Sequence, residues 1–410
     1  MHTTSWDSLP AEMKYSVVEL LDLKNTASFA KSSRETYALS IPTMFRDIKL
    51  TGYEALQSFV TSVPPMHCCY VRTLHITIPE SATGLLSCGQ VTNTLTHLLG
   101  RCFQIEELSL HIAGSLKPCI IPSFRNLQSL WKLSISNCGR EDITPLSERL
   151  VVSIAASLPC LSDLTIDGIS RSAIHAPELL GSYPFIPVVA GDDDLPAHPL
   201  LGFDLSLPSL LRIPTLRVLR MRETHMGDQR WCSTPALCRL DVLEVGSSCY
   251  ESPDSNRVFA ERILQNIGNS VEELSLSSSL ASALSPVGGA LPSLRQLRIT
   301  KLFPLEYLAE TLSALSHSPI ELLSIECHED DIEDMCYALE DFLNLCAEHR
   351  REPIYCHLKH ISLQPVAETS SVSSSAAKLN TAVADSLSGD AAMAIQRVQQ
   401  YLQDIRFSRK

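Results

Sequence analysis

A short hydrophobic pattern recurs along most of the chain, and it constrains the fold more than any other feature of the sequence. The pattern is hydrophobic-x-x-hydrophobic-x-hydrophobic, and its copies start roughly 20 to 40 residues apart, with one longer gap. The alternation of apolar and polar residues within each copy is typical of a half-buried strand. The copies are VRTLHI (71–76), IEELSL (105–110), LWKLSI (130–135), LSDLTI (161–166), LRVLRM (216–221), LDVLEV (240–245), VEELSL (271–276), LRQLRI (294–299), IELLSI (320–325) and LKHISL (358–363).

Several segments between these copies have helical periodicity. Residues 254–268 carry apolar side chains on one side and end at Gly268, and residues 143–158 and 331–349 follow the same pattern. Strand and helix in alternation resemble the leucine-rich-repeat family. We therefore predict an α/β fold in which an irregular leucine-rich-repeat horseshoe spans residues 50–365, with parallel strands on its concave face and helices on its convex face. The family's asparagine or cysteine, nine positions into a repeat, is matched cleanly only by Cys138.

The long gap in the repeats coincides with a proline-rich stretch. Residues 183–214 carry six prolines and an acidic triplet, and such a density of proline prevents a continuous helix or central strand. We expect an irregular insertion at 170–214, which is either a degenerate repeat or a long loop over one face.

The composition shifts again after residue 365. Residues 366–390 are rich in serine and alanine, which is typical of a flexible linker. Residues 391–410 then place Ile395, Val398, Leu402 and Ile405 on one helical stripe. We expect an amphipathic helix there, which docks back onto the preceding repeat as a cap.

Residues 1–49 have the pattern of three short helices. Pro10 is suited to the first turn of a helix, and Asn25 to the N-cap of a second one. A third helix is expected to end before Pro42. The first helix has an apolar face formed by Met13, Val17, Leu20 and Leu21. Three such helices form too small a core to be stable alone, so we expect them to pack against a neighbour.

The stretch SLPAEMKYSVVELLDLKNTASFAKSSRETYALSIPTMFRDIKL (8–50) joins Leu-Pro-x-Glu-hydrophobic to an apolar helix, a Phe-bearing helix and a terminal helix. This order resembles the F-box, and PTMFRDIKL is similar to the exit sequence of fungal F-box proteins. Thr26 stands where the family often has leucine, and Tyr37 where it often has tryptophan. The resemblance implies a substrate receptor of an SCF-type ubiquitin ligase, which would bind a Skp-type adaptor and through it a cullin-RING ligase. The implied adaptor contacts are Leu9, Pro10, Met13, Val17, Leu20, Leu21 and Phe29.

An alternative interpretation of the N-terminal helices needs no adaptor. A solenoid requires a terminal cap, and a cap shows the same amphipathic pattern. On this interpretation the chain is a non-enzymatic leucine-rich-repeat scaffold for protein–protein interactions.

The x positions of the repeats are expected to face the concave surface, where a protein target would bind. Arg217, Arg220, Arg222 and Arg298 are candidate contacts there, because guanidinium groups pair with carboxylates and phosphates. Trp131 is a candidate aromatic anchor. Acidic x positions in neighbouring copies suggest a self-neutralising ladder instead, with Arg217 beside Asp241, Arg220 beside Glu244 and Glu272 beside Arg295.

Charge and composition exclude several classes of function. A formal net charge of −13 argues against nucleic acid or an anionic membrane as the main partner. No stretch resembles a secretory signal or a membrane span, so we expect a cytoplasmic or nuclear protein. The 14 cysteines lie in apolar segments without CxxC pairs, so we expect reduced, mostly buried thiols and no metal site. Because no catalytic motif is present, we expect no catalytic residues and no cofactor.

Overall fold

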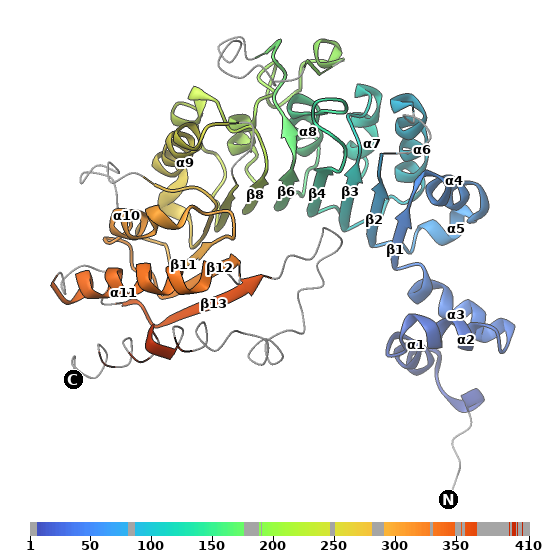
Figure 1. The fold of residues 1–410 in the computed structure, drawn as a ribbon. Coiled ribbons are helices and arrows are strands. Elements are labelled where there is room, and N and C mark those ends of the chain that lie inside the picture. Colours follow the sequence, from blue (N-terminus) through green and yellow to red (C-terminus); the bar gives the residue numbers. More distant parts are fainter. Residues whose placement is uncertain are drawn as a thin grey trace, which may run out of the picture. The chain divides into compact units, whose positions relative to one another are not determined.

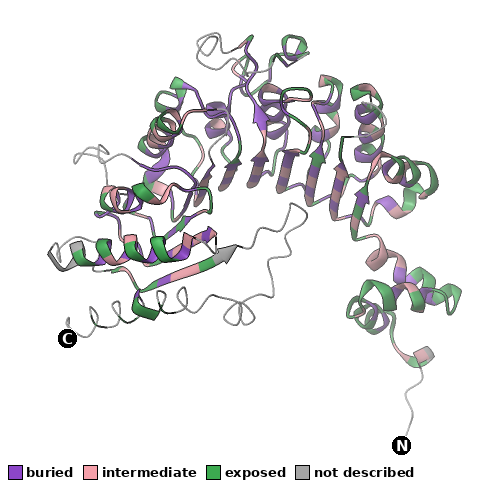
Figure 2. Cartoon of the chain, viewed as in Figure 1, coloured by how far each residue is buried: buried purple, intermediate pink, exposed green. Residues whose placement is uncertain are grey.

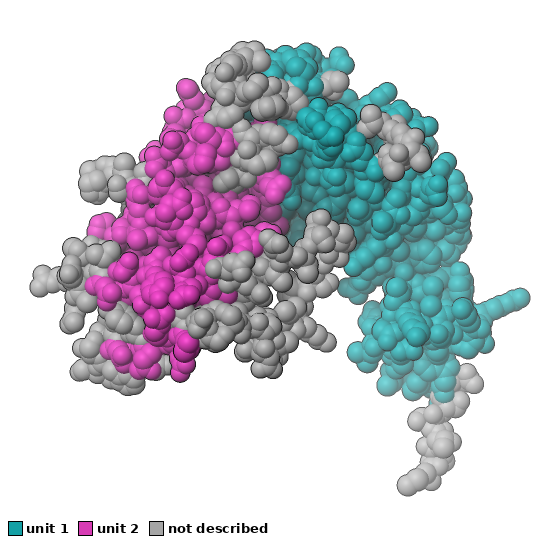
Figure 3. Space-filling model, viewed as in Figure 1, with its two compact units in different colours: residues 1–210 teal, residues 211–410 magenta. Residues whose placement is uncertain are grey.

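The structure is a computed structural model that divides into two compact units, Met1–Leu210 and Leu211–Lys410 (Figure 3). Each unit is described by itself below. The residues that the structure describes are 6–80, 87–175, 188–189, 191–246, 251–280, 291–328, 331–348, 354, 357–366, 393, 396–398, 400 and 404.

Unit 1 begins with a short helix, η1 (Trp6–Ser8), and three α-helices, α1 (Ala11–Glu19), α2 (Leu23–Ala30) and α3 (Arg34–Met44). Asp22 caps α2 by accepting a hydrogen bond from the backbone N–H of Asn25, so the prediction that Asn25 itself is the cap is wrong. Ser33 and Thr36 form a reciprocal capping box at the start of α3. The third helix also continues past Pro42, contrary to prediction. Pro42 lies in the last turn, so the one hydrogen bond that it removes, and any bend that its ring causes, fall where the helix is about to end.

The rest of unit 1 is built on parallel strands in the order β1 (Asp47–Thr51), β2 (Thr73–Ile78), β3 (Glu107–Ile112), β4 (Lys132–Asn137) and β6 (Asp163–Asp167). A separate two-stranded sheet pairs β5 (Leu146–Ser147) with β7 (Ile169–Ser170). The connecting helices are α4 (Tyr53–Ser62), α5 (Pro65–Cys68), α6 (Cys88–Arg101), η2 (Pro118–Ile120), α7 (Ile121–Arg125) and α8 (Glu148–Ala156). Helices α4, α6, α7 and α8 follow one another along the same side of the strands (Figure 1).

Unit 2 repeats the parallel arrangement. Its strand order is β8 (Val218–Arg222), β9 (Val242–Val245), β10 (Glu273–Leu276), β11 (Gln296–Ile299), β12 (Leu322–His328) and β13 (His360–Val366). The helices between these strands are η6 (Gln229–Cys232), α9 (Pro253–Ile267), η7 (Gly268–Ser270), η8 (Leu305–Tyr307), α10 (Leu308–Ala314) and α11 (Ile332–Glu348). All ten predicted segments contain a parallel strand, so the α/β class is confirmed. Strand β1, which pairs with β2, was not predicted.

The hydrophobic pattern accounts for the core of each unit. In the copy at 71–76, Val71 lies in the turn before β2, while Leu74 and Ile76 point inward from the strand, and all three are fully buried. Register places Leu74 beside Leu108. The intervening strand residues are only partly covered, as the alternating colours along the strands show (Figure 2). This alternation is the period of two that one buried face of a sheet requires.

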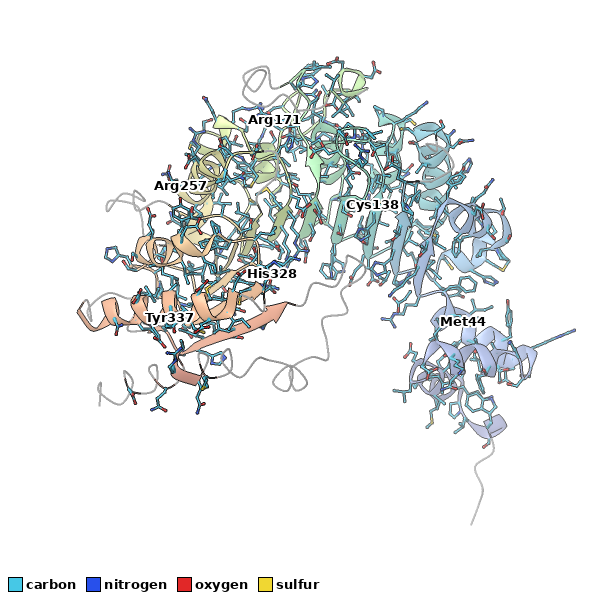
Figure 4. All side chains as sticks on the ribbon, in the orientation of Figure 1. Met44, Cys138, Arg171, Arg257, His328 and Tyr337 are labelled. Atoms are coloured by element: carbon cyan, nitrogen blue, oxygen red, sulfur yellow. The ribbon has the colours of Figure 1, made fainter. Side chains whose placement is uncertain are left out.

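The proline-rich insertion is anchored on α8. Its acidic triplet forms the short helix η4 (Asp192–Asp194), and Asp192 accepts a hydrogen bond from the hydroxyl of Ser147. Glu148 accepts a hydrogen bond of 2.7 Å from the backbone N–H of Leu207 in η5 (Leu207–Arg212), and lies 3.9 Å from Arg171 (Figure 4). All of these side chains are buried, so the described part of the insertion is fixed by polar contacts with α8. Residues 176–187 and 190 of the predicted insertion lie outside the described residues.

The C-terminal predictions are covered only in part. The linker predicted at 366–390 lies outside the described residues except for Val366, which ends β13. Within the predicted helix, Val398 is buried, and Arg397 lies 5.3 Å from the ring centre of Tyr337 on α11 (Figure 4). Ile395, Leu402 and Ile405 lie outside the described residues.

Cysteines of the described chain are free thiols, but the expectation that most are buried is wrong. Cys68, Cys102, Cys327 and Cys336 are buried, whereas Cys88, Cys119, Cys138, Cys160 and Cys232 are exposed. The exposed ones lie near strand or helix ends, where the apolar pattern stops.

Candidate functional site

The N-terminal helices enclose a small core with an unexpected composition. Val18 is fully buried, and beside it lies Lys14, whose Nζ is 2.6 Å from a carboxylate oxygen of Glu35. The same ammonium lies 5.7 Å from the ring centre of Trp6, and Trp6 packs edge-on against Phe29 at 5.2 Å. The inward side of α1 is therefore formed by Lys14 and Val18.

This arrangement leaves the predicted apolar face of α1 in solvent. Leu20 is 87 % exposed, and Met13 and Val17 are also exposed. Helix α1 ends at Glu19, so Leu20 and Leu21 follow the helix and do not continue its stripe, contrary to prediction. Most of the ribbon of α1 and the start of α2 has the colour of exposed residues in Figure 2.

The remaining predicted adaptor contacts divide by burial. Pro10 is exposed, whereas Leu9, Leu21 and Phe29 are half-buried. Leu23, the first residue of α2, is 64 % exposed and was missed by sequence reasoning. Leu23 follows the Asp22 cap directly and is therefore the first helical residue. That position could have predicted its exposure, because side chains at the first helical position seldom contribute to the buried face of a short helix. We define the N-terminal apolar surface as Met13, Val17, Leu20 and Leu23.

The two departures from the F-box pattern have different environments. Thr26 is fully buried, and its hydroxyl donates a 2.8 Å hydrogen bond to the backbone carbonyl of Asp22. The polar atom of the threonine is thus satisfied within its own helix. Tyr37 is exposed.

The candidate target contacts lie in different units. Trp131 is in unit 1, directly before β4, and its ring is 40 % exposed with Nζ of Lys132 at 5.8 Å from its centre. The candidate arginines are all in unit 2. The strand face of each unit is therefore described by itself.

The strand face of unit 1 carries hydroxyl and imidazole groups. His111 on β3 is hydrogen-bonded to Ser136 through Nδ1, and its Nε2 lies 3.1 Å from the hydroxyl of Ser109. Burial lowers the pKa of His111. Burial and the nearby Lys49 ammonium lower the pKa of His75. Both imidazoles are therefore neutral at pH 7.

The strand face of unit 2 carries paired charges. Arg222 donates two hydrogen bonds, of 2.6 and 2.8 Å, to the two carboxylate oxygens of Glu244. Arg220 is opposite Glu244 in register and lies 3.9 Å from it, as the ladder predicts. Arg298 is hydrogen-bonded to Glu326 on β12.

Two of the predicted ladder pairs lie side by side in the backbone pairing, as predicted, but they form no ion pair in the described part of the chain. Arg217 donates its side-chain hydrogen bond to the backbone carbonyl of Arg239 and not to Asp241. Arg295 lies 4.0 Å from Glu321 and forms no ion pair with Glu272. Glu321 also accepts a hydrogen bond from Lys359, which lowers the pKa of that carboxyl group. Arg295 has an acidic residue on each side, Glu272 and Glu321, and the pattern along the chain does not say which one it selects.

Comparisons with known proteins add no assignment for these surfaces. No protein-family model matches the chain, and no curated protein matches its sequence. Within the described ranges, no cluster of three or more His, Cys, Asp or Glu side chains is placed to hold a metal ion. No helix in the described part of the chain has the length and apolarity needed to cross a membrane.

Proposed function

We propose that this chain is the substrate-recognition subunit of an SCF-type ubiquitin ligase. Its N-terminal helices bind a Skp-type adaptor, and through the adaptor a cullin-RING ligase. Its parallel strands belong to leucine-rich-repeat-like units that bind a protein target. The proposal places the chain in the cytoplasm or nucleus, where the other subunits of such a ligase would be found.

The exposure of Leu20 is the observation that carries the proposal. Leu20 is among the residues that the F-box resemblance assigns to the adaptor, and 87 % of its surface faces solvent. Burying a leucine of this exposure contributes roughly 1.5–3 kcal/mol. Four such side chains in the N-terminal apolar surface supply enough apolar contact to anchor a small interface.

The pattern of burial favours an adaptor over a simple cap. A cap turns its apolar side chains toward the structure that it covers. Here Lys14 and Thr26 are buried, whereas Met13, Val17, Leu20 and Leu23 face solvent. An outward apolar surface is the arrangement expected of a docking module.

The target-binding role is supported by the two strand faces. Trp131 gives unit 1 an exposed aromatic anchor, with the Lys132 ammonium near its ring, and aromatic residues of this kind dominate interface energetics. In unit 2 the arginines are paired with carboxylates, so a negatively charged target must displace or share those carboxylates. We therefore assign the first contact with a target to the face that contains Trp131.

The test is co-purification of the full chain with a Skp-type adaptor. Wild type is expected to form a one-to-one complex, and Leu20→Glu is expected to weaken it at least tenfold, because a desolvated carboxylate replaces the apolar contact. Leu302→Glu is the matched control, since Leu302 is an exposed leucine of unit 2. Circular dichroism should show the same helix content in both variants.

Two results would overturn the proposal. One is no capture of the adaptor by folded wild type. The other is equal capture by Leu20→Glu and Leu302→Glu. Deletion of residues 1–44 tests the alternative scaffold, because this deletion ends with α3 and leaves β1 intact. Removing a true cap should lower the melting temperature of the remaining chain, whereas removing a docking module should not.

A further inference from the structure

A pocket of about 350 Å³ opens at the carboxyl ends of β2 and β3 in unit 1. Ile78 and Ile112, the last residues of these strands, lie at its base, and Val91 of α6 forms one side. Val189 of the insertion closes another side. The pocket lies beyond the carboxyl ends of these strands, and its volume lies within the range of small-molecule sites.

The side chain of Asn137 holds two walls of the pocket together. Its Oδ1 accepts hydrogen bonds from the backbone N–H groups of Gly114 and Gly139, at 3.2 and 3.0 Å. Its Nδ2 donates a 2.9 Å hydrogen bond to the carbonyl of Thr144. Gly114 has a φ of +87°, a conformation that glycine adopts without strain. One side chain at the end of β4 thus fixes both loops that line the pocket.

Helix α6 also holds the loop that follows β3, which forms one wall of the pocket. The hydroxyl of Thr92 accepts a 3.0 Å hydrogen bond from the backbone N–H of Lys117. The thiol of Cys88 lies 2.9 Å from the carbonyl oxygen of Ser115. A pocket whose walls are tied at three points is formed before a ligand arrives, so binding costs little conformational entropy.

The lining is apolar apart from its rim. Val91, Ile112, Leu116 and Val189 are buried. Glu80 is the one charged side chain among the lining residues that the structure describes, and no ion pair or hydrogen bond is found for its carboxylate in that part of the chain. Although Cys88 as a residue is exposed, partial burial of its thiol raises the pKa of that group, so Cys88 adds no negative charge at pH 7.

We propose that this pocket binds a compact organic cation. The ligand would be an amine attached to an apolar group of about two fused rings. An apolar cavity of ~150 Å³ accommodates a benzene ring, and this pocket has somewhat more than twice that volume. The amine would pair with Glu80 at the rim while the rings displace water from the apolar walls. Neither an adaptor nor a protein target requires this site, so it is a function beyond the one proposed above.

The test uses two probes of equal shape and opposite charge on the full chain. Fluorescence or calorimetric titration at pH 7 is expected to show saturable one-to-one binding of 1-naphthylmethylamine. The anion 1-naphthoate should bind at least about tenfold more weakly, a difference of about 1.4 kcal/mol.

Two variants locate the binding. Glu80→Gln should remove the preference for the amine, and Glu54→Gln, an exposed position on α4, is the control that should keep it. Val188→Trp should weaken both probes, because Val188 is an exposed lining residue and tryptophan there fills the mouth without entering the core. Equal affinity of wild type for the two probes, binding by neither, or an unchanged preference in Glu80→Gln would overturn the proposal.

Discussion

The ammonium of Lys14 on α1 and the carboxylate of Glu35 on α3 lie 2.6 Å apart, with Lys14 buried and Glu35 half in solvent. Removing the charge of Glu35 leaves the buried ammonium without its anion. Because Glu35 is partly screened by water, we expect Glu35→Gln to destabilise the helices by only about 1 kcal/mol. Hydrogen exchange of peptides from 11–44 should then be roughly fivefold faster.

Glu19→Gln is the control for this change, since Glu19 is exposed at the end of the same helix. Equal exchange in the two variants would show that the Lys14–Glu35 pair does not hold α1 on α3. Exchange in α9, in unit 2, should be unaffected by either substitution.

The paired hydrogen bonds between Arg222 and Glu244 make a second, sharper prediction. Exposed ion pairs contribute little unless the geometry is two-pronged, as it is here. Glu244→Gln should lower the free energy of unfolding by about 1 kcal/mol at low salt, and the loss should shrink as salt is added. Asp254→Asn is the control, because Asp254 is highly exposed and its contact with Arg257 is a single one of 3.5 Å. A loss in Glu244→Gln that is independent of salt would contradict the ionic explanation.

The strands could be predicted because each repeats the same short apolar pattern. Observed strands generally start two residues after the start of the predicted segments, since the first apolar residue of a copy, such as Val71 before β2, is buried ahead of the strand. Leu358, which begins the last copy, is the half-buried exception. Burial alone therefore does not mark the start of a strand. Strand β1 escaped prediction because only Leu50 among its residues is buried.

The candidate surfaces were harder to predict, because they depend on contacts between residues distant in sequence. Lys14 is buried although its side chain is charged, because its ammonium contacts Glu35 and Trp6. Both of these residues come from other elements, so the sequence of α1 alone does not predict the burial. The partner of Arg295 depends on which neighbouring strand offers the better geometry. The Asn137 contacts that shape the pocket join the end of β3 and the end of β4 with the loop that follows β4. No local sequence motif predicts such contacts.

Gly139 provides a test of that pocket wall. A Cβ at this position would lie 2.2 Å from Oγ1 of Thr144 and 2.9 Å from Cβ of Ala113. Gly139→Ala should therefore displace the wall and destabilise unit 1 by about 1–3 kcal/mol. Gly100→Ala is the matched control, since a Cβ there meets nothing within 4 Å and alanine favours the helix. Thermal unfolding should show a lower midpoint for the first variant and an equal or higher one for the second. If Gly139→Ala leaves the midpoint of thermal unfolding unchanged, the pocket wall can move aside without a cost in stability.

The pH dependence of unit 1 should depend on Asp192. Burial raises the pKa of this carboxyl group, against the opposing effects of Ser147, His175 and Arg149. One of its oxygens accepts the hydrogen bond from Ser147, and the other is buried without a hydrogen-bond partner in the described part of the chain. The raised pKa means that folding favours the protonated form. Its contribution to stability is complete below the unperturbed value of 3.8 and is lost as pH rises through the pKa in the folded state.

Asp192→Asn keeps an oxygen acceptor for Ser147 and removes the buried charge. We expect the variant to be more stable than wild type at neutral pH, with a difference that shrinks as the pH is lowered through the folded-state pKa of Asp192. Urea unfolding at a series of pH values measures this difference, and Asp194→Asn, an exposed position in the same short helix, should show none. A difference that stays constant with pH would mean that Asp192 keeps one protonation state throughout, and that the insertion is held on α8 by neutral hydrogen bonds alone.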